Sequence, residues 1–158
     1  MTMKRFFCAA LLSASAALAL AQDGPYDESA DANAQVAAAL QSAHAAHKLP
    51  LLVFGANWCP DCRLLDIEMR KGKLAALVGD KFVVVKVDVG RFDRNTDVAA
   101  RFGVPLGKGI PAVAVLREDG SVAYLTAGGE LADARKMGGE GIAKFFDDMA
   151  ARVGAARS

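Results

Sequence analysis

Two cysteines separated by only two residues follow closely on a continuous apolar run. The run, Leu-Leu-Val-Phe at residues 51–54, has the length and composition of a buried strand. Pro60 lies between the cysteines, where the first turn of a helix tolerates proline, and apolar residues continue at helical spacing toward Leu77. The chain is therefore expected to turn from a strand into a helix here, with Cys59 at the helix N-terminus and Cys62 one turn further along.

The other predicted elements complete one α/β domain. A β-branched run at 82–88 follows the helix, so residues 51–88 predict a βαβ unit with two parallel neighbouring strands. With 158 residues, 53% of them hydrophobic and 23% charged, the chain is long enough for one compact domain. The remaining elements are expected to be a hairpin of strands at 112–116 and 122–126, and helices at 31–48, 96–102 and 142–153.

The first residues have the features of an export signal. Lys4 and Arg5 precede an apolar run at 6–20, and the run ends in Ala-Leu-Ala, a pattern that signal peptidase recognises. The run has about 15 residues, fewer than the roughly 20 of a membrane-spanning helix. We expect a signal peptide at 1–21, cleaved after Ala21, a periplasmic location and no stable membrane insertion after cleavage. An uncleaved anchor is the alternative.

Removal of the signal would take Cys8 with it and leave both remaining cysteines in one motif. Disulfides that stabilise a fold usually close longer loops than this two-residue gap, so the spacing favours a switchable dithiol. The mature chain is expected to comprise a flexible lead-in at 22–33, a domain at 34–153 and a flexible tail at 154–158.

The charges exclude some classes of partner. The 19 Lys and Arg nearly balance the 18 Asp and Glu, so no strong positive field is available to attract nucleic acid or anionic lipid. Aromatic residues make up only 7% of the chain, too few to suggest a platform for stacking bases. Nucleic acid is not an expected partner.

Two segments together resemble the thioredoxin superfamily, over residues 34–153. The first is Trp58-Cys-Pro-Asp-Cys after a buried strand, and the second is Gly109-Ile110-Pro111 before a later strand. The resemblance implies an α/β thioredoxin fold, in which helices flank a central mixed four-stranded sheet and an extra helix lies at the N-terminus. It also implies the strand order 82–88, 51–55, 112–116, 122–126, with Pro111 cis and beside the cysteines.

The resemblance also implies an enzyme, a thiol–disulfide oxidoreductase acting on protein or peptide thiols and disulfides. Cys59 is expected to attack, because a helix N-terminus stabilises a thiolate, and Cys62 to resolve the mixed disulfide. The Cys59–Cys62 disulfide would be the redox centre, and no other cofactor is expected. Trp58, Ile110 and Pro111 are expected to bind substrate, although Trp58 could be an ordinary half-buried aromatic and Pro111 a plain strand-opening proline.

Three residues are expected to tune the redox chemistry: Pro60, Asp61 and Lys86. Lys86 matches the family's partner lysine, whereas Val53 stands where the family has a buried carboxylate. Oxidising relatives have His where this chain has Asp61, and a carboxylate there is expected to repel the Cys59 thiolate and compete for the same helix donors. The sequence therefore favours a reductase supplied by a membrane electron donor.

Other functions stay open from the sequence. The enzyme could introduce or isomerise disulfides, it could consume peroxide, or the fold could be a redox-inert binding module. The loop at 104–109, longer than usual for the family, lies at the expected substrate rim, so substrate choice cannot be inferred from cytosolic thioredoxins.

His44 and His47 could in principle join the two cysteines in a zinc site. The histidines precede the strand at 51–55 and the cysteines follow it, which separates the two pairs by about 15–20 Å at 3.3 Å per residue. No metal site is therefore predicted.

Overall fold

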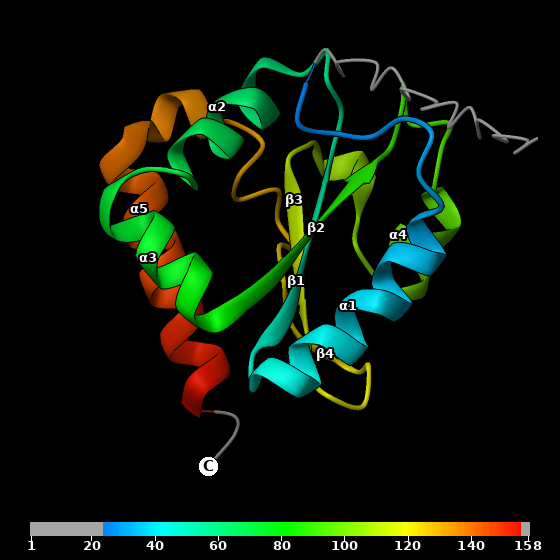
Figure 1. The fold of residues 1–158 in the computed structure, drawn as a ribbon. Helices are drawn as coiled ribbons and strands as arrows, with labels where there is room; N and C mark the ends of the chain where they lie inside the picture. The colour runs from blue at the N-terminus through cyan, green and yellow to red at the C-terminus, as the bar shows by residue number, and fades with distance from the viewer. Residues whose placement is uncertain (1–23, 156–158) are drawn as a thin grey trace, which may run out of the picture.

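The computed structural model describes residues 24–155, in which helices cover both faces of a four-stranded mixed sheet (Figure 1). The sheet order is β2-β1-β3-β4, as predicted. The strands are β1 (Leu49–Gly55), β2 (Phe82–Asp88), β3 (Ala112–Leu116) and β4 (Val122–Leu125). The helices are α1 (Ala32–Ala46), α2 (Pro60–Glu68), α3 (Gly72–Lys81), α4 (Thr96–Arg101) and α5 (Ala134–Ala155), with a 3-10 turn η1 (Leu106–Lys108). The predicted thioredoxin fold is confirmed.

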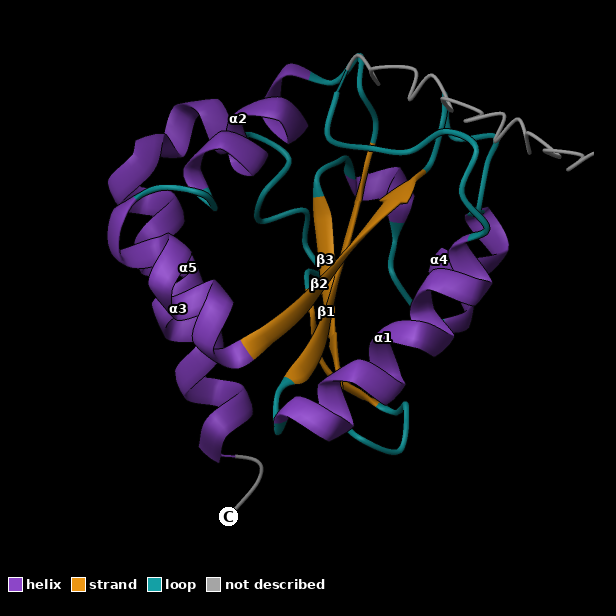
Figure 2. Cartoon of the chain, viewed as in Figure 1, coloured by secondary structure: helices purple, strands orange, loops and turns teal. Residues whose placement is uncertain are grey.

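The central strand β1 lies between β2 and β3, and all seven of its residues are buried. It pairs parallel with β2, where Val53 lies opposite Lys86, and antiparallel with β3, where Phe54 lies opposite Ala112. Because alternate side chains of a strand point to opposite faces, Phe54 packs on the side of α1 and α4 and Val53 on the side of α2, α3 and α5 (Figure 2). The end of β1 therefore holds the start of α2 in a defined place.

The single helix expected from Pro60 toward Leu77 is two helices in the structure. Helix α2 ends at Glu68, and Lys71 is extended, with φ −116° and ψ 142°. Gly72 then begins α3 with φ +49°, a conformation that glycine adopts at little steric cost. The spacing of apolar residues continues from α2 into α3, so the sequence pattern does not reveal the break between the two helices.

Helix α5 begins earlier than the predicted 142–153 segment and ends later. It starts at Ala134 and is interrupted at Gly138, where φ is 66° and ψ is 176°. The glycines around this point remove the apolar periodicity that would reveal a helix. Because α5 continues to Ala155, the start of the predicted flexible tail is helical; residues 156–158 lie outside the described residues.

The predicted flexible lead-in, 22–33, also differs from the structure. The Tyr26 side chain is fully buried. The backbone N–H of Tyr26 donates to Asn57 Oδ1 at 3.0 Å, and its backbone carbonyl accepts from Asn57 Nδ2 at 2.9 Å. Asp31 then caps α1 by accepting from the N–H of Ala34 at 3.0 Å. Most of this segment thus belongs to the packed domain, through contacts 31 residues apart in sequence that local patterns do not reveal.

The predicted signal peptide at 1–21 lies outside the described residues, as do residues 22 and 23. Between residues 24 and 155, none of the helices combines the length and the apolar character that crossing a membrane requires.

Candidate active site

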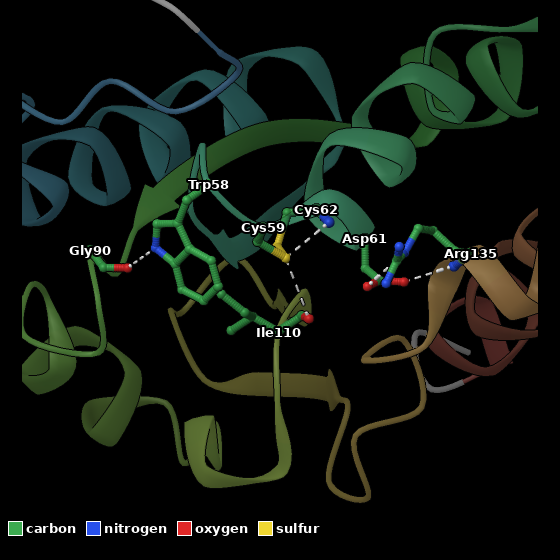
Figure 3. The surroundings of a disulfide bond; sticks show 7 residues. All are labelled: Trp58, Cys59, Asp61, Cys62, Gly90, Ile110 and Arg135. Atoms are coloured by element: carbon green, nitrogen blue, oxygen red, sulfur yellow. Dashed lines mark hydrogen bonds and ion pairs between the residues drawn. A yellow bond between two sulfur atoms is a disulfide. The ribbon is translucent and has the colours of Figure 1, made fainter.

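The two cysteines of the motif form a disulfide at the start of α2 (Figure 3). Cys59 is the N-cap of the helix, and Pro60 takes up the first turn, where no hydrogen-bond donor is needed. The N–H of Cys62 donates to Cys59 Sγ at 3.2 Å. Cys59 is 3% exposed and Cys62 0%. Attack on a substrate disulfide needs an accessible sulfur, and the structure leaves only a small part of Cys59 exposed.

The loop before β3 passes directly beside Cys59. The Ile110–Pro111 peptide bond is cis, and the carbonyl oxygen of Ile110 lies 3.7 Å from Cys59 Sγ. Both Ile110 and Pro111 are buried, so it is the backbone of Ile110, not its side chain, that faces the sulfur. The structure thus brings together three residues that the sequence analysis selected from segments about 50 positions apart.

Trp58 lies at the rim of the site and is 48% exposed, so about half of its surface is open to solvent beside the cysteines. Its indole N–H donates to the carbonyl of Gly90 at 2.7 Å (Figure 3). Its ring makes an edge contact with Phe92, at 6.2 Å between centroids, and the Arg91 guanidinium lies 5.7 Å from the ring. These contacts hold an exposed aromatic surface in place beside the cysteines.

Phe92 extends this surface into an apolar groove that the sequence analysis missed. The ring is 44% exposed, and the groove beside it has a volume of about 480 Å³. The groove runs between α4 and the loop at 104–109 and is lined by Phe92, Thr96, Ala99, Ala100, Val104, Leu106, Gly107 and Gly109. The expectation that this loop borders the site agrees with its position.

The charge of Asp61 is paired across the molecule, contrary to the sequence argument. The carboxylate accepts from the backbone N–H of Arg135 at 2.9 Å and from its Nε at 3.2 Å (Figure 3). Asp61 is only 8% exposed. Its oxygens are directed to Arg135 at the start of α5, which compensates its charge, and its effect on the Cys59 thiolate stays a prediction. The partner is 74 residues away in sequence and has no local signal.

Lys86 has a carboxylate partner that the sequence analysis also missed. Its Nζ lies 3.2 Å from Asp66 Oδ1, and the Asp66 side chain is 10% exposed. Burial lowers the pKa of Lys86, while the negative charge of Asp66 raises it again in part. Asp66 lies one turn after Cys62 on α2, so this helix supplies a buried carboxylate although Val53 on β1 has none. The spacing of Cys62 and Asp66 on one helix face could have indicated it.

His44 and His47 lie at the end of α1, away from the cysteines along β1. His44 Nδ1 lies 3.5 Å from Glu118 Oε2 at the surface, and His47 is the C-terminal cap of the helix. Across residues 24–155 there is no group of three or more His, Cys, Asp or Glu side chains that could hold a metal ion.

Comparison with known proteins agrees with this geometry. A family model described as thioredoxin-like matches residues 31–117, more than half of the chain. The crystal structure of a disulphide isomerase from Xylella fastidiosa Temecula1 is 53% identical, with a TM-score of 0.78, and the match covers 82% of this chain and 98% of that one. A thioredoxin from Thermus thermophilus shares the fold at 20% identity and a TM-score of 0.54, covering 77% of this chain and 88% of that one. No curated protein matches the sequence.

The family match and the 53% identical structure both align with the region that carries the Cys59–Cys62 disulfide. The disulfide lies at a helix N-terminus beside a cis-proline loop, which is an arrangement suited to thiol–disulfide exchange. The chain therefore belongs to the thioredoxin-like family and is a thiol–disulfide oxidoreductase.

Proposed function

We propose that this oxidoreductase is exported to the periplasm and reduces disulfides of proteins or peptides. The observation that carries the proposal is the position of Cys59, whose sulfur accepts from the Cys62 N–H at 3.2 Å and lies 3.7 Å from the Ile110 carbonyl. The N–H favours the Cys59 thiolate, and the carbonyl offers a strand-like pairing partner to an extended substrate. Trp58 and the groove beside Phe92 supply apolar surface for the flanking substrate side chains.

Reduction of a substrate disulfide proceeds in two successive thiol–disulfide exchanges. The Cys59 thiolate attacks one sulfur of the substrate disulfide, a mixed disulfide forms, and the other substrate sulfur leaves as a thiolate. The Cys62 thiolate then attacks Cys59 Sγ, the Cys59–Cys62 disulfide forms, and the second substrate sulfur leaves. The substrate gains two electrons and the enzyme loses two, which a membrane electron donor would restore.

The direction of electron flow is argued from the charges near Cys59. Strong oxidants of this fold place a cation between the cysteines, which stabilises the reduced enzyme; here the position holds Asp61, paired with Arg135. A neutral pair gives the thiolate no such stabilisation. We expect a reduction potential nearer thioredoxin's, about −270 mV, than that of the strong oxidants of this fold, about −120 mV. Equilibration with glutathione measures it, and a value above about −180 mV would contradict the reductase assignment.

Isomerisation is the second candidate, because the 53% identical Xylella structure carries the name disulphide isomerase. The two functions differ in net electron transfer. A reductase precipitates insulin in the presence of dithiothreitol, whereas an isomerase restores activity to a protein with scrambled disulfides while the total number of thiols stays constant. A redox-inert binding module would do neither.

Export is argued from the sequence, where Lys4 and Arg5 precede the apolar run and Ala21 follows it as the last residue of the cleavage pattern. The intact mass of the exported protein tests it. We expect a chain that begins at Gln22, and recovery of residues 1–21 in a membrane fraction would contradict the proposal.

A further inference from the structure

Tyr26 carries a buried hydroxyl group that lies beside Gly55, close to Cys62 of the active-site disulfide. The residue is 0% exposed, and Gly55, the last residue of β1, leaves room for it. A Cβ atom on Gly55 would lie 2.2 Å from Tyr26 Oη and 3.0 Å from Cys62 Sγ. The hydroxyl and the sulfur of Cys62 therefore border the same small space, which exists because residue 55 has no side chain.

The Tyr26 hydroxyl has no hydrogen-bond partner among the residues that the structure describes. Buried polar groups are nearly always paired, and each one left unpaired is costly. The rest of the residue is held firmly: its backbone is bonded to Asn57 at both N–H and carbonyl, and Lys86 Nζ lies 5.7 Å from the centre of its ring. The Tyr26 side chain is thus held in a position where no residue between 24 and 155 pairs with its hydroxyl group in the oxidised protein.

Reduction changes what lies beside the hydroxyl. In the disulfide, Cys62 Sγ is a weak acceptor, whereas a thiolate carries a full negative charge and accepts strongly. Burial raises the pKa of Tyr26, and the carboxylates of Asp66 and Asp88 raise it further. The phenol therefore keeps its proton and can act only as a donor toward the sulfur.

We propose that the Tyr26 hydroxyl donates a hydrogen bond to Cys62 Sγ when Cys62 becomes a thiolate, and so acts as a positioning residue for the resolving step. The inference rests on the proposed role of Cys62 as the resolving thiol. In that step the Cys62 thiolate attacks Cys59 Sγ, the bond from Cys59 to the substrate breaks, and the Tyr26 proton stays on its oxygen throughout. The hydrogen bond favours the nucleophile and then loses its acceptor as the disulfide forms.

The effect on rate follows from two opposing terms. At pH values below the titration midpoint of Cys62, loss of one charge-assisted hydrogen bond would reduce the thiolate fraction of Cys62 about tenfold. A more basic thiolate is also a better nucleophile, with a Brønsted coefficient of about 0.4–0.5, which recovers about threefold. The Tyr26→Phe variant is therefore expected to resolve mixed disulfides about threefold more slowly at neutral pH.

The direct test is the titration midpoint of Cys62 in a Cys59→Ser background, with and without Tyr26→Phe. Cysteine labelled with carbon-13 at Cβ reports ionisation by NMR even for a fully buried thiol. We expect the midpoint to rise by about one pH unit in the Phe variant, which is the tenfold change above. Tyr124→Phe is the matched control, because Tyr124 is the other tyrosine of the chain and packs against Phe145 on α5; it should leave the midpoint unchanged.

An unchanged midpoint in a folded Tyr26→Phe variant would overturn the inference. If that variant does not fold, the unmodified protein labelled at the tyrosine ring carbon that bears the hydroxyl provides the second measurement. On reduction, above the midpoint of Cys62, the Tyr26 signal should shift and the Tyr124 signal should not; equal behaviour of the two would contradict the proposal. Neither measurement depends on turnover, so a failure here is distinct from a failure of the reductase assignment.

Discussion

Gly55 is the residue that permits the close packing under the disulfide. Any side chain at this position would meet the Tyr26 hydroxyl and Cys62 Sγ at 2.2 and 3.0 Å. Gly79, on α3, is a useful contrast because a Cβ there would meet no atom within 4 Å. The same substitution to alanine would therefore meet close neighbours at Gly55 and none at Gly79.

This contrast gives a first prediction. Gly55→Ala should lower the free energy of unfolding by about 1–3 kcal/mol, because the added methyl overpacks a closed core. Gly79→Ala should raise it by about 0.4–1 kcal/mol, because alanine restricts the unfolded chain and favours a helix. Urea unfolding of both variants is the measurement, and a Gly55→Ala protein as stable as the parent would show that the space under Cys62 is not closed.

The buried Tyr26 hydroxyl group gives a second prediction, for the free energy of unfolding at alkaline pH. Its ordinary pKa is 10.0, and burial raises that pKa in the folded protein. Above about pH 10 the unfolded chain therefore releases a proton that the folded protein retains, so stability falls as pH rises, by up to about 1.4 kcal/mol per pH unit. The stability is complete below pH 10 and is lost above it.

Tyr26→Phe should remove this loss, and urea unfolding between pH 8 and pH 11 would show a flatter curve for the variant. Lys86 acts in the opposite direction, because burial lowers its pKa from 10.5, but it does so in both proteins and cancels in the difference. Parallel curves for the two proteins would contradict the assignment of Tyr26 as a buried, protonated phenol.

At the scale of elements, the start of α2 is connected to α5 by the Asp61–Arg135 pair. Arg135 lies in the first turn of α5, and the pair compensates a carboxylate located between the two cysteines. The charge beside the α2 N-terminus is therefore paired with a residue of a helix near the other end of the chain.

Arg135→Gln should make the enzyme more reducing. The substitution leaves Asp61 with an uncompensated charge, which disfavours the Cys59 thiolate and hence the reduced form, and we expect the potential to fall by about 30 mV. Glutathione equilibration measures this change. Lys136→Gln is the matched control, since Lys136 is exposed and pairs with exposed Asp133. A potential that rises, or that falls equally in the control, would argue against the role of the pair.

At the scale of the whole molecule, the sequence predicts those features that depend on local pattern. The apolar run of β1, the proline after Cys59 and the Ile110–Pro111 segment are each visible within a few residues. The sheet order and the meeting of the two segments come from the resemblance to the thioredoxin superfamily that these segments carry. The break between α2 and α3 is missed because the apolar spacing continues across Lys71 and Gly72.

The electrostatic partners are not predictable in this way, because each depends on a tertiary contact. Asp61 meets Arg135 across 74 positions, and Tyr26 meets Asn57 across 31. Asp66 and Lys86 pair only because α2 packs over the sheet at the position of Val53. The sequence therefore identifies the cysteine pair, Asp61 and Lys86, whereas the partners of Asp61 and Lys86 emerge only from the fold.

The most direct test of the central claim uses the Cys62→Ser variant, which can form a mixed disulfide at Cys59 but cannot resolve it. Incubated in reduced form with a disulfide-containing protein, it should accumulate covalent adducts at Cys59, visible by non-reducing electrophoresis and reversed by dithiothreitol. A variant lacking both Cys59 and Cys62 should form none of these adducts. Absence of adducts with Cys62→Ser, or equal adducts with the double variant, would contradict the assignment of Cys59 as the attacking thiol of a thiol–disulfide oxidoreductase.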